Sequence, residues 1–437
     1  MAHDTRTTLL NFVNHFKRAI GLEMDAMRER RGSFEVRLIE GKKDAVEDDR
    51  EGERYTYSMV AVEDKLVAGM ECTLRISARE YLIRIESIDG LILTLWSERE
   101  VDLEGGQGTL VIYPWFLYEK LINVLDELGE ENYSAERALA LFGKVRPKIY
   151  QRSLVRDHPG LNASQLAAVQ LCSDSDLSFV WGPPGTGKTT TLAHIVSELM
   201  AQDMRVLVLS TTNAALDQAL AKMAEKVEMV EAINAGKIVR IGRSEAPTFG
   251  AGIHDVVMRQ NAVHRECLER LAARQPEVEE AWGRCEKVLE GLADADKPIQ
   301  QSLFNDEPKQ PGPDLVGIFK DRRIIRLRDC SPGELLGIVR RRHARLGRLR
   351  DLYSKGIADR KKALRQREQG AVEGASLILA TLTNAYFSPL MKDQRFDVVV
   401  VEEASMAILP ALFYAACLGH RKTIMVGDPC QLPSIVQ

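Results

Sequence analysis

The sequence GPPGTGKTT occupies residues 182–190 and contains the pattern G-x-x-x-x-G-K-[ST] without a mismatch. An apolar run from Leu177 to Trp181 predicts a buried strand before it, and Lys188 to Leu199 predicts the helix that follows. This order places a phosphate over a helix N-terminus, where unpaired N–H groups and the helix dipole favour an anion. The alternative is a glycine- and proline-rich turn with a chance lysine. We predict a nucleoside triphosphate site.

The residue types of this loop suit a phosphate. Glycines let the backbone approach the phosphates closely. Lys188 is expected to reach the β- and γ-phosphates, and Thr189 to place its hydroxyl on Mg²⁺. ATP and Mg²⁺ are therefore the expected cofactors. The predicted nucleotide-binding residues of the loop are Gly182, Pro183, Pro184, Gly185, Thr186, Gly187, Lys188, Thr189 and Thr190.

The composition sets limits on the rest of the chain. Its 437 residues suggest several domains, and a hydrophobic fraction of 45% supports ample cores. The net charge of −4 means that any nucleic-acid surface must be local. Seven scattered cysteines without a C-x-x-C pattern argue for reduced thiols and against a zinc site. No signal pattern or apolar run of about 18 residues occurs, so we expect a cytoplasmic protein without a membrane partner.

Residues 1–150 predict one unit. Apolar residues at helical spacing between residues 5 and 30 indicate a long helix, and alternation between Phe34 and Tyr113 indicates several short strands. Helical periodicity returns from Trp115 to Leu141. We expect a small β-barrel of about five or six strands held on stalk helices.

Residues 151–242 and 374–437 alternate strands with helices, which predicts an α/β fold with a parallel sheet covered on both faces. The expected strands after the first one are 205–210, 237–241, 376–382, 396–401 and 423–426, and the expected helices include 213–226 and 405–418.

Residues 243–373 interrupt this alternation and predict an inserted helical arm. Helices near 254–293 and 332–369 form an expected antiparallel pair, joined by a flexible loop around Asp296 to Pro313. The arm carries basic clusters, which are Arg322-Arg323, Arg340-Arg341-Arg342 and Arg360-Lys361-Lys362. These clusters either follow a phosphate backbone or form a solvated surface paired with an acidic helix. The acidic residues are Glu266, Glu269, Glu277, Glu279, Glu280 and Glu286.

Two further segments carry candidate catalytic residues. The apolar run VVVVEEAS ends in Glu402 and Glu403, and we expect its strand to lie beside the strand before the P-loop. Glu402 is the candidate acid on the Mg²⁺ side and Glu403 the candidate base, whereas the alternative is a solvated acidic pair. In VGDPCQLPS, residues 426–434, Gln431 is able to hydrogen-bond a γ-phosphate or its water. Gln165, ahead of the loop, is a candidate for reading the adenine edge.

These segments occur in a characteristic order, which is Gln165, GPPGTGKTT (182–190), STTNAALDQ (210–218), LATLTN (379–384), FDVVVVEEAS (396–405) and VGDPCQLP (426–433). In this order the chain resembles superfamily 1B, the 5′-to-3′ helicase branch that includes the senataxin and nonsense-mediated-decay helicases. The resemblance implies a first RecA-like domain, a small β-barrel on stalk helices and a helical insertion.

The resemblance also implies contacts to single-stranded DNA or RNA at the strand ends. The implied residues, which would grip the sugar-phosphate backbone, are Ser210, Thr211, Asn213, Thr381 and Thr383. The alternative for such residues is helix capping, for example by Thr212 or Asn213. The sequence does not distinguish DNA from RNA.

The chain departs from the family pattern in two residues and in its extent. Glu402 stands where the family usually has Asp, and Met406 where Gln is common, which affects the expected rate rather than binding. Gln437 follows the last motif closely, and no segment has the pattern of a second RecA-like domain. We therefore expect slow hydrolysis by this chain alone and a second RecA-like domain or subunit as a partner. The alternative function is a nucleotide-dependent nucleic-acid or protein binding module without helicase activity.

Overall fold

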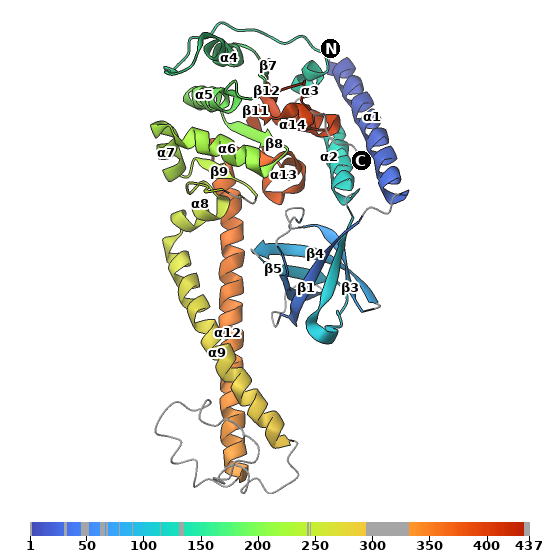
Figure 1. Cartoon of the computed structure of the whole chain (residues 1–437), viewed down its shortest axis with the longest axis vertical. Helices are drawn as coiled ribbons and strands as arrows, with labels where there is room; N and C mark the ends of the chain where they lie inside the picture. Colours follow the sequence, from blue (N-terminus) through green and yellow to red (C-terminus); the bar gives the residue numbers. More distant parts are fainter. Residues whose placement is uncertain are drawn as a thin grey trace. The chain divides into compact units, whose positions relative to one another are not determined.

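The computed structural model describes residues 2–29, 33–44, 52–61, 66, 69–77, 79–89, 91–113, 115–130, 135–242, 244, 246–293 and 332–431 (Figure 1). It divides into two compact units. The first is made of Met1–Lys43, Glu51–Gln260 and Gln366–Gln437, and the second of Asp44–Arg50 and Asn261–Arg365.

A closed antiparallel barrel forms the N-terminal part of the first unit. Its strands are β1 (Phe34–Lys43), β2 (Glu53–Met59), β3 (Glu71–Ile76), β4 (Arg79–Asp89), β5 (Ile92–Ser97) and β6 (Gly108–Ile112). They close in the order β1-β2-β5-β4-β3-β6. Side chains alternate between the buried interior and the outside, as Tyr55 and Tyr57 on β2 show. The expected small barrel is confirmed, with six strands.

Three helices flank the barrel in the sequence, namely α1 (Ala2–Glu29), α2 (Trp115–Glu130) and α3 (Ala135–Leu141). Phe12 and Phe16 of α1 meet Phe142, just after α3, and Phe413 of α14 (Leu409–Leu418). Their ring centroids lie between 5.1 and 5.9 Å apart. Large aromatic rings bury much apolar area, so this cluster holds the stalk helices against the α/β domain.

The α/β domain contains a six-stranded parallel sheet. Its strands are β7 (Leu177–Trp181), β8 (Val206–Ser210), β9 (Ile238–Arg240), β10 (Leu377–Thr381), β11 (Phe396–Glu402) and β12 (Gly419–Gly427). Their order is β7-β12-β11-β8-β10-β9. One expectation is therefore wrong. The acidic strand β11 is not beside the P-loop strand β7, because β12 pairs with both of them and lies between.

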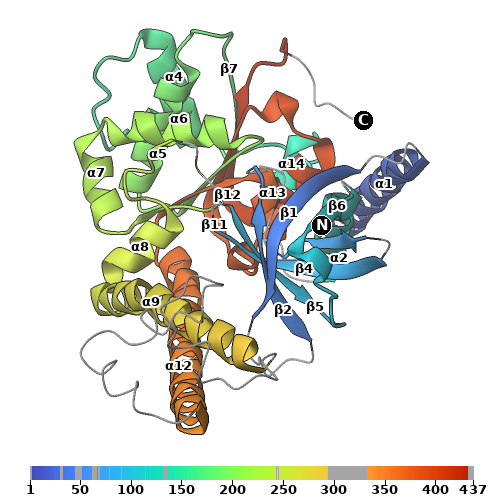
Figure 2. The same ribbon diagram turned by 60° about the horizontal axis from the view of Figure 1, so that its bottom comes forward.

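Helices cover both faces of this sheet, as expected (Figure 2). One face carries α4 (Ala163–Asp174), α5 (Lys188–Ala201), α6 (Asn213–Ala224) and α7 (Val227–Asn234), and the other carries α13 (Leu382–Phe387) and α14. The helix expected from residue 405 begins only at Leu409, after a short 3₁₀ turn over Ala404–Met406. Pro410 lies in the first turn of α14, where its missing N–H costs no hydrogen bond.

The arm consists of α9 (Ala262–Ala293) and α12 (Pro332–Glu373), preceded by α8 (Ile253–Gln260). Trp282 of α9 stacks on His343 of α12, and Gln275 hydrogen-bonds Ser354. Later residues of α9 thus meet earlier residues of α12, which confirms the antiparallel pair. The expected loop around residues 296–313 lies outside the described residues. None of the helices described is long and apolar enough to cross a membrane.

Candidate nucleotide-binding site

The P-loop connects β7 to α5 at the carboxyl end of the sheet. Gly185 and Gly187 have φ angles of 79° and 81°, which non-glycine residues rarely adopt. A Cβ at Gly187 would lie only 2.7 Å from Nε2 of Gln165. The backbone angle therefore favours glycine at residue 187, and a larger residue would also displace the amide of Gln165.

Contacts within the loop fix its shape. The Lys188 Nζ donates to the Gly182 carbonyl at 2.8 Å, and the Thr186 hydroxyl donates to the Pro183 carbonyl at 2.7 Å. Pro184 lies inside this turn, and Thr190 belongs to the first turn of α5. The loop is thus held in a closed shape, with the ammonium of Lys188 folded back over it.

Glu402, at the end of β11, contacts the P-loop, and Glu403 directly follows it. Glu402 is only 4% exposed, and its Oε1 accepts a hydrogen bond of 3.5 Å from the Thr189 hydroxyl. Burial and the neighbouring charge of Glu403 raise the pKa of the Glu402 carboxyl to about 7, whereas Thr189 and Lys188 act in the opposite direction. Glu403 adopts a left-handed conformation with φ of 52°. Such strain is often found at functional sites. The solvated acidic pair is excluded for Glu402.

Buried oxygen atoms without a hydrogen-bond partner gather around these acids. The Oε2 atoms of Glu402 and Glu403 and the hydroxyls of Ser210, Thr211 and Ser405 are all in this state. Ser210 lies in register with Glu402 on the adjacent strand β8. Buried polar groups without partners are costly, so this cluster suits a polar occupant. Oxygen donors at the P-loop threonine suit Mg²⁺ with its water shell, which Thr189 and Glu402 would hold.

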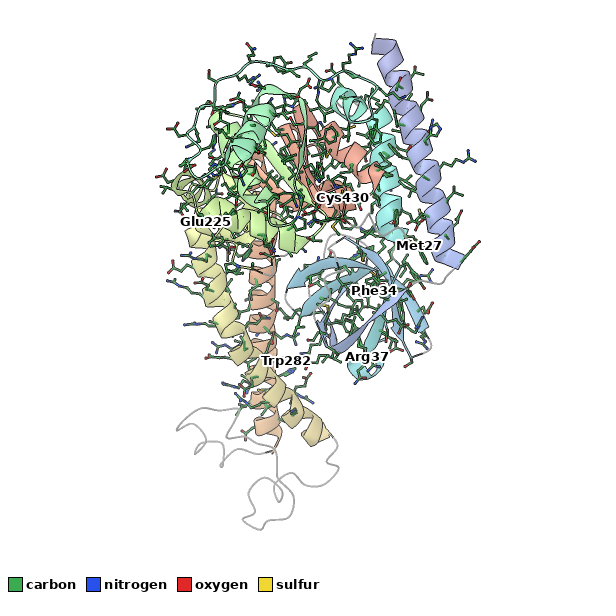
Figure 3. All side chains as sticks on the ribbon, turned by 45° about the horizontal axis from the view of Figure 1, so that its top comes forward. Met27, Phe34, Arg37, Glu225, Trp282 and Cys430 are labelled. Atoms are coloured by element: carbon green, nitrogen blue, oxygen red, sulfur yellow. The ribbon has the colours of Figure 1, made fainter. Side chains whose placement is uncertain are left out.

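A second set of hydrogen bonds links the P-loop strand to the turn that carries Gln431. The Trp181 indole N–H donates to Asp428 Oδ1 at 3.0 Å, and the Gln431 amide donates to Asp428 Oδ2 at 3.3 Å. Cys430 marks this turn in Figure 3, and its backbone N–H also donates to Oδ1. The sequence alone indicates no role for Trp181 or Asp428, because these two residues lie 247 positions apart and only the fold brings them into contact.

Gln165 lies against the P-loop, as its predicted role requires. Its Oε1 accepts from the Asn162 backbone N–H, in a capping box at the start of α4, and its Nε2 donates to the Thr186 carbonyl at 3.0 Å. The amide still has a second hydrogen and a second lone pair that could bind the adenine edge. The contact with adenine itself stays a prediction.

The strand-end residues divide into two groups. Ser210 is 0% exposed and lies beside Glu402, so its expected direct contact with a nucleic acid is wrong. The other four residues are at least partly exposed, although the Thr211 hydroxyl is itself buried, and their role stays a prediction. Thr212 and Thr381 cap α6 and α13, as the capping alternative states.

Two of the remaining strand-end residues have further contacts. Asn213 accepts a hydrogen bond of 2.8 Å from Arg240, a buried residue that also pairs with Asp217. Sequence reasoning missed Arg240, since a single arginine at the end of a strand gives no signal. Thr383 contacts the hydroxyl of Tyr386. These contacts hold the strand ends of β8, β9 and β10 in place.

A parallel sheet with a P-loop, a buried acid on the P-loop threonine and a second acid beside it defines a P-loop nucleoside triphosphatase. The model of the AAA domain family matches residues 160–437, more than half of the chain. The chain therefore belongs to the AAA domain family, and it contains the first RecA-like domain of a superfamily 1B helicase.

The similar proteins include proteins named as helicases, as a DNA-binding protein and as a regulator of nonsense transcripts 1 homolog. The chain is 24% identical to an uncharacterised ATP-dependent helicase of Methanocaldococcus jannaschii, over 74% of this chain and 47% of that protein. It is 26% identical to the DNA polymerase alpha-associated DNA helicase A of Schizosaccharomyces pombe, over 63% and 32%. It is 22% identical to a regulator of nonsense transcripts 1 homolog of Arabidopsis thaliana, over 85% and 25%. The chain thus spans less than half of the length of each relative.

Proposed function

We propose that this chain is the ATP-binding motor half of a helicase that moves 5′-to-3′ along single-stranded DNA or RNA. The observation that carries the proposal is the contact between Thr189 of the P-loop and Glu402 of β11, which are 213 residues apart in the sequence. A phosphate-binding loop and a buried acid meet there in the arrangement that ATP hydrolysis needs.

Each residue of the site has a task in hydrolysis. Lys188 and the backbone N–H groups of the loop bind the phosphates, and Gln431 contacts the γ-phosphate. Glu403 orients a water and accepts its proton as the water oxygen attacks the γ-phosphorus and the bond to the β-phosphate oxygen breaks. Mg²⁺, held by Thr189 and Glu402, would neutralise charge on the β- and γ-phosphates.

Coupling to a nucleic acid is proposed from the position of the strand ends. β8 lies between β11, which carries Glu402, and β10, which ends at Thr381. Thr211, Asn213, Thr381 and Thr383 follow or end these strands, and backbone N–H, hydroxyl and amide groups at such positions suit contacts to phosphates and sugars of any sequence. If ATP binding shifts Glu402 on β11, the shift would therefore reach the proposed nucleic-acid contacts through the neighbouring strand β8.

A second RecA-like domain or subunit is proposed as the partner that completes the site. Within the described residues, the parallel strands form a single sheet, and the chain spans less than half of each relative. Arginines from such a partner contribute about 10³- to 10⁵-fold to the rate in related triphosphatases. Alone, the chain should bind ATP and hydrolyse it slowly.

The test is ATP hydrolysis by the purified chain with oligo(dT) or oligo(U), measured in single-turnover reactions. We expect ATP binding, slow turnover and stronger binding to the single strands when a non-hydrolysable ATP analogue is present. Rapid turnover without a partner would contradict the need for a second domain. The alternative, a nucleotide-dependent binding module, predicts the same binding but no hydrolysis even after a second RecA-like domain is added.

A further inference from the structure

The indole of Trp181 occupies an unusual position at the edge of the sheet. Trp181 is the last residue of β7 and directly precedes Gly182, the first residue of the P-loop. The residue is 64% exposed, so burial does not fix the orientation of its indole. Its indole N–H nevertheless donates a hydrogen bond to Asp428, which is only 3% exposed. The sheet holds the backbone of Trp181, and this hydrogen bond orients its exposed indole.

The carboxylate of Asp428 links Trp181 to Gln431. Its Oδ1 accepts from the Trp181 N–H and from the Cys430 backbone N–H, each at 3.0 Å, and its Oδ2 accepts from the Gln431 amide. The backbone N–H of Gln431 also donates to the Asp428 carbonyl at 3.0 Å. One carboxylate is thus fixed by three donors, and the side chain of Gln431 takes its position from that carboxylate.

The backbone couples the same two elements. Trp181 lies in register with Gly427 on β12, and the Gly182 N–H donates to the Gly427 carbonyl at 3.3 Å. The start of the P-loop and the start of the Gln431 turn therefore move together. The hydrogen bond from Trp181 adds a side-chain link between them, within the reach of the charge of Lys188.

We infer that Trp181 is a positioning residue which, through Asp428, sets the amide of Gln431 for the γ-phosphate and so lets the site distinguish ATP from ADP. The inference rests on the proposed function, because it assigns Gln431 to the third phosphate. Trp181 touches no phosphate in this account. It acts only through Asp428, and its loss should weaken ATP binding while leaving ADP binding almost unchanged.

The experiment compares the Kd values of ATP and ADP, measured by calorimetry on the full chain with Mg²⁺. Trp181→Phe keeps a ring and removes the N–H, and we expect the preference for ATP over ADP to fall about fivefold, the effect of one lost hydrogen bond. Asp428→Asn keeps an acceptor for Trp181 but turns an amide N–H₂ toward Gln431, so it should lower the preference similarly. The double variant should be no worse than the stronger single variant.

Phe179→Leu is the matched control. Phe179 lies two residues earlier on the same strand, is 60% exposed and has no N–H to donate, so its variant should keep the wild-type preference. An unchanged preference in Trp181→Phe, or additive losses in the double variant, would overturn the inference while ATP binding by the wild type upholds the proposed function. A wild type that binds neither nucleotide would overturn both.

Discussion

The nucleotide end of the parallel sheet and the basic helix α12 of the arm both concentrate polar groups, but they do so in opposite ways. At the sheet, Glu402 and Ser210 are buried and fixed between neighbouring strands, and Asp428 accepts hydrogen bonds from three donors. Helix α12 contains twelve Lys and Arg residues but five Asp and Glu residues, and many of the basic side chains are exposed. Burial gives the first region a defined geometry, whereas the second offers charge without fixed positions.

Within the arm, the side of α12 that contacts α9 holds an arginine in a defined position, whereas other arginines of α12 are exposed. Arg350 lies over the ring of Trp282 of α9, which Figure 3 labels, with its guanidinium carbon 4.1 Å from the ring centroid. Arg341, Arg345 and Arg348 are exposed at helical spacing. The ion pairs of α9 run along that helix, from Arg270 to Glu266 and from Arg284 to Glu280. Among the described side chains, these ion pairs lie within α9, and both interpretations of the basic clusters stay predictions.

The largest effect is expected from Glu403→Gln at the nucleotide end. The substitution removes the group that accepts the proton of the attacking water, so single-turnover hydrolysis should fall about 10²- to 10⁴-fold. The affinity for ATP should stay close to that of the wild type, because the P-loop contacts remain. A fall in hydrolysis of less than about tenfold would show that Glu403 does not act as the base.

Lys188→Ala should have the next largest effect. It removes the ammonium that lies over the P-loop, and the loss of charge-assisted hydrogen bonds to the phosphates should lower ATP affinity on the order of a hundredfold. Calorimetry gives the Kd values, and thermal unfolding checks that the fold is intact. Wild-type affinity in this variant would place the nucleotide elsewhere.

A triple substitution on the arm, Arg341→Gln, Arg345→Gln and Arg348→Gln, decides between its two interpretations. If the exposed face of α12 contacts a phosphate backbone, the slope of log K against log salt should fall by about two for a single strand. The control removes Arg270 and Arg284 of α9, which have partners on their own helix, and should leave the slope nearly unchanged. An unchanged slope in the triple variant supports the solvated helix surface.

The smallest effect is expected at His194, on the buried side of α5. Burial, with Lys226 and His158 nearby, lowers the pKa of His194 to about 4, and Glu228 acts in the opposite direction. Between pH 6.5 and about 4 the unfolded chain binds a proton at this residue that the folded chain does not, so stability is lost as the pH falls through this window. His194→Asn should make the thermal midpoint less sensitive to pH there, and differential scanning calorimetry at several pH values measures it.

The sequence was sufficient for the features that depend on local order. The P-loop is a contiguous motif, and the apolar run before Glu402 predicts a buried strand that ends in acids. The antiparallel arm follows from two long helical patterns. In each of these cases the residues that carry the signal lie next to one another in the chain.

Other features depend on contacts between distant residues, and the sequence did not reveal them. The insertion of β12 between β7 and β11 is set by pairing across the sheet, which motif order does not encode. The burial of Ser210 depends on its register with Glu402, and the role of Trp181 depends on Asp428, 247 residues away. Arg240 binds Asn213 through the same kind of long-range contact.

A crystal structure of the chain with Mg²⁺ and a non-hydrolysable ATP analogue would show whether ATP binds at the P-loop beside Glu402. We expect the γ-phosphate between Lys188 and Gln431, with Mg²⁺ at the Thr189 hydroxyl on the side of Glu402. A nucleotide bound away from this loop, or a metal ion remote from Glu402, would contradict it.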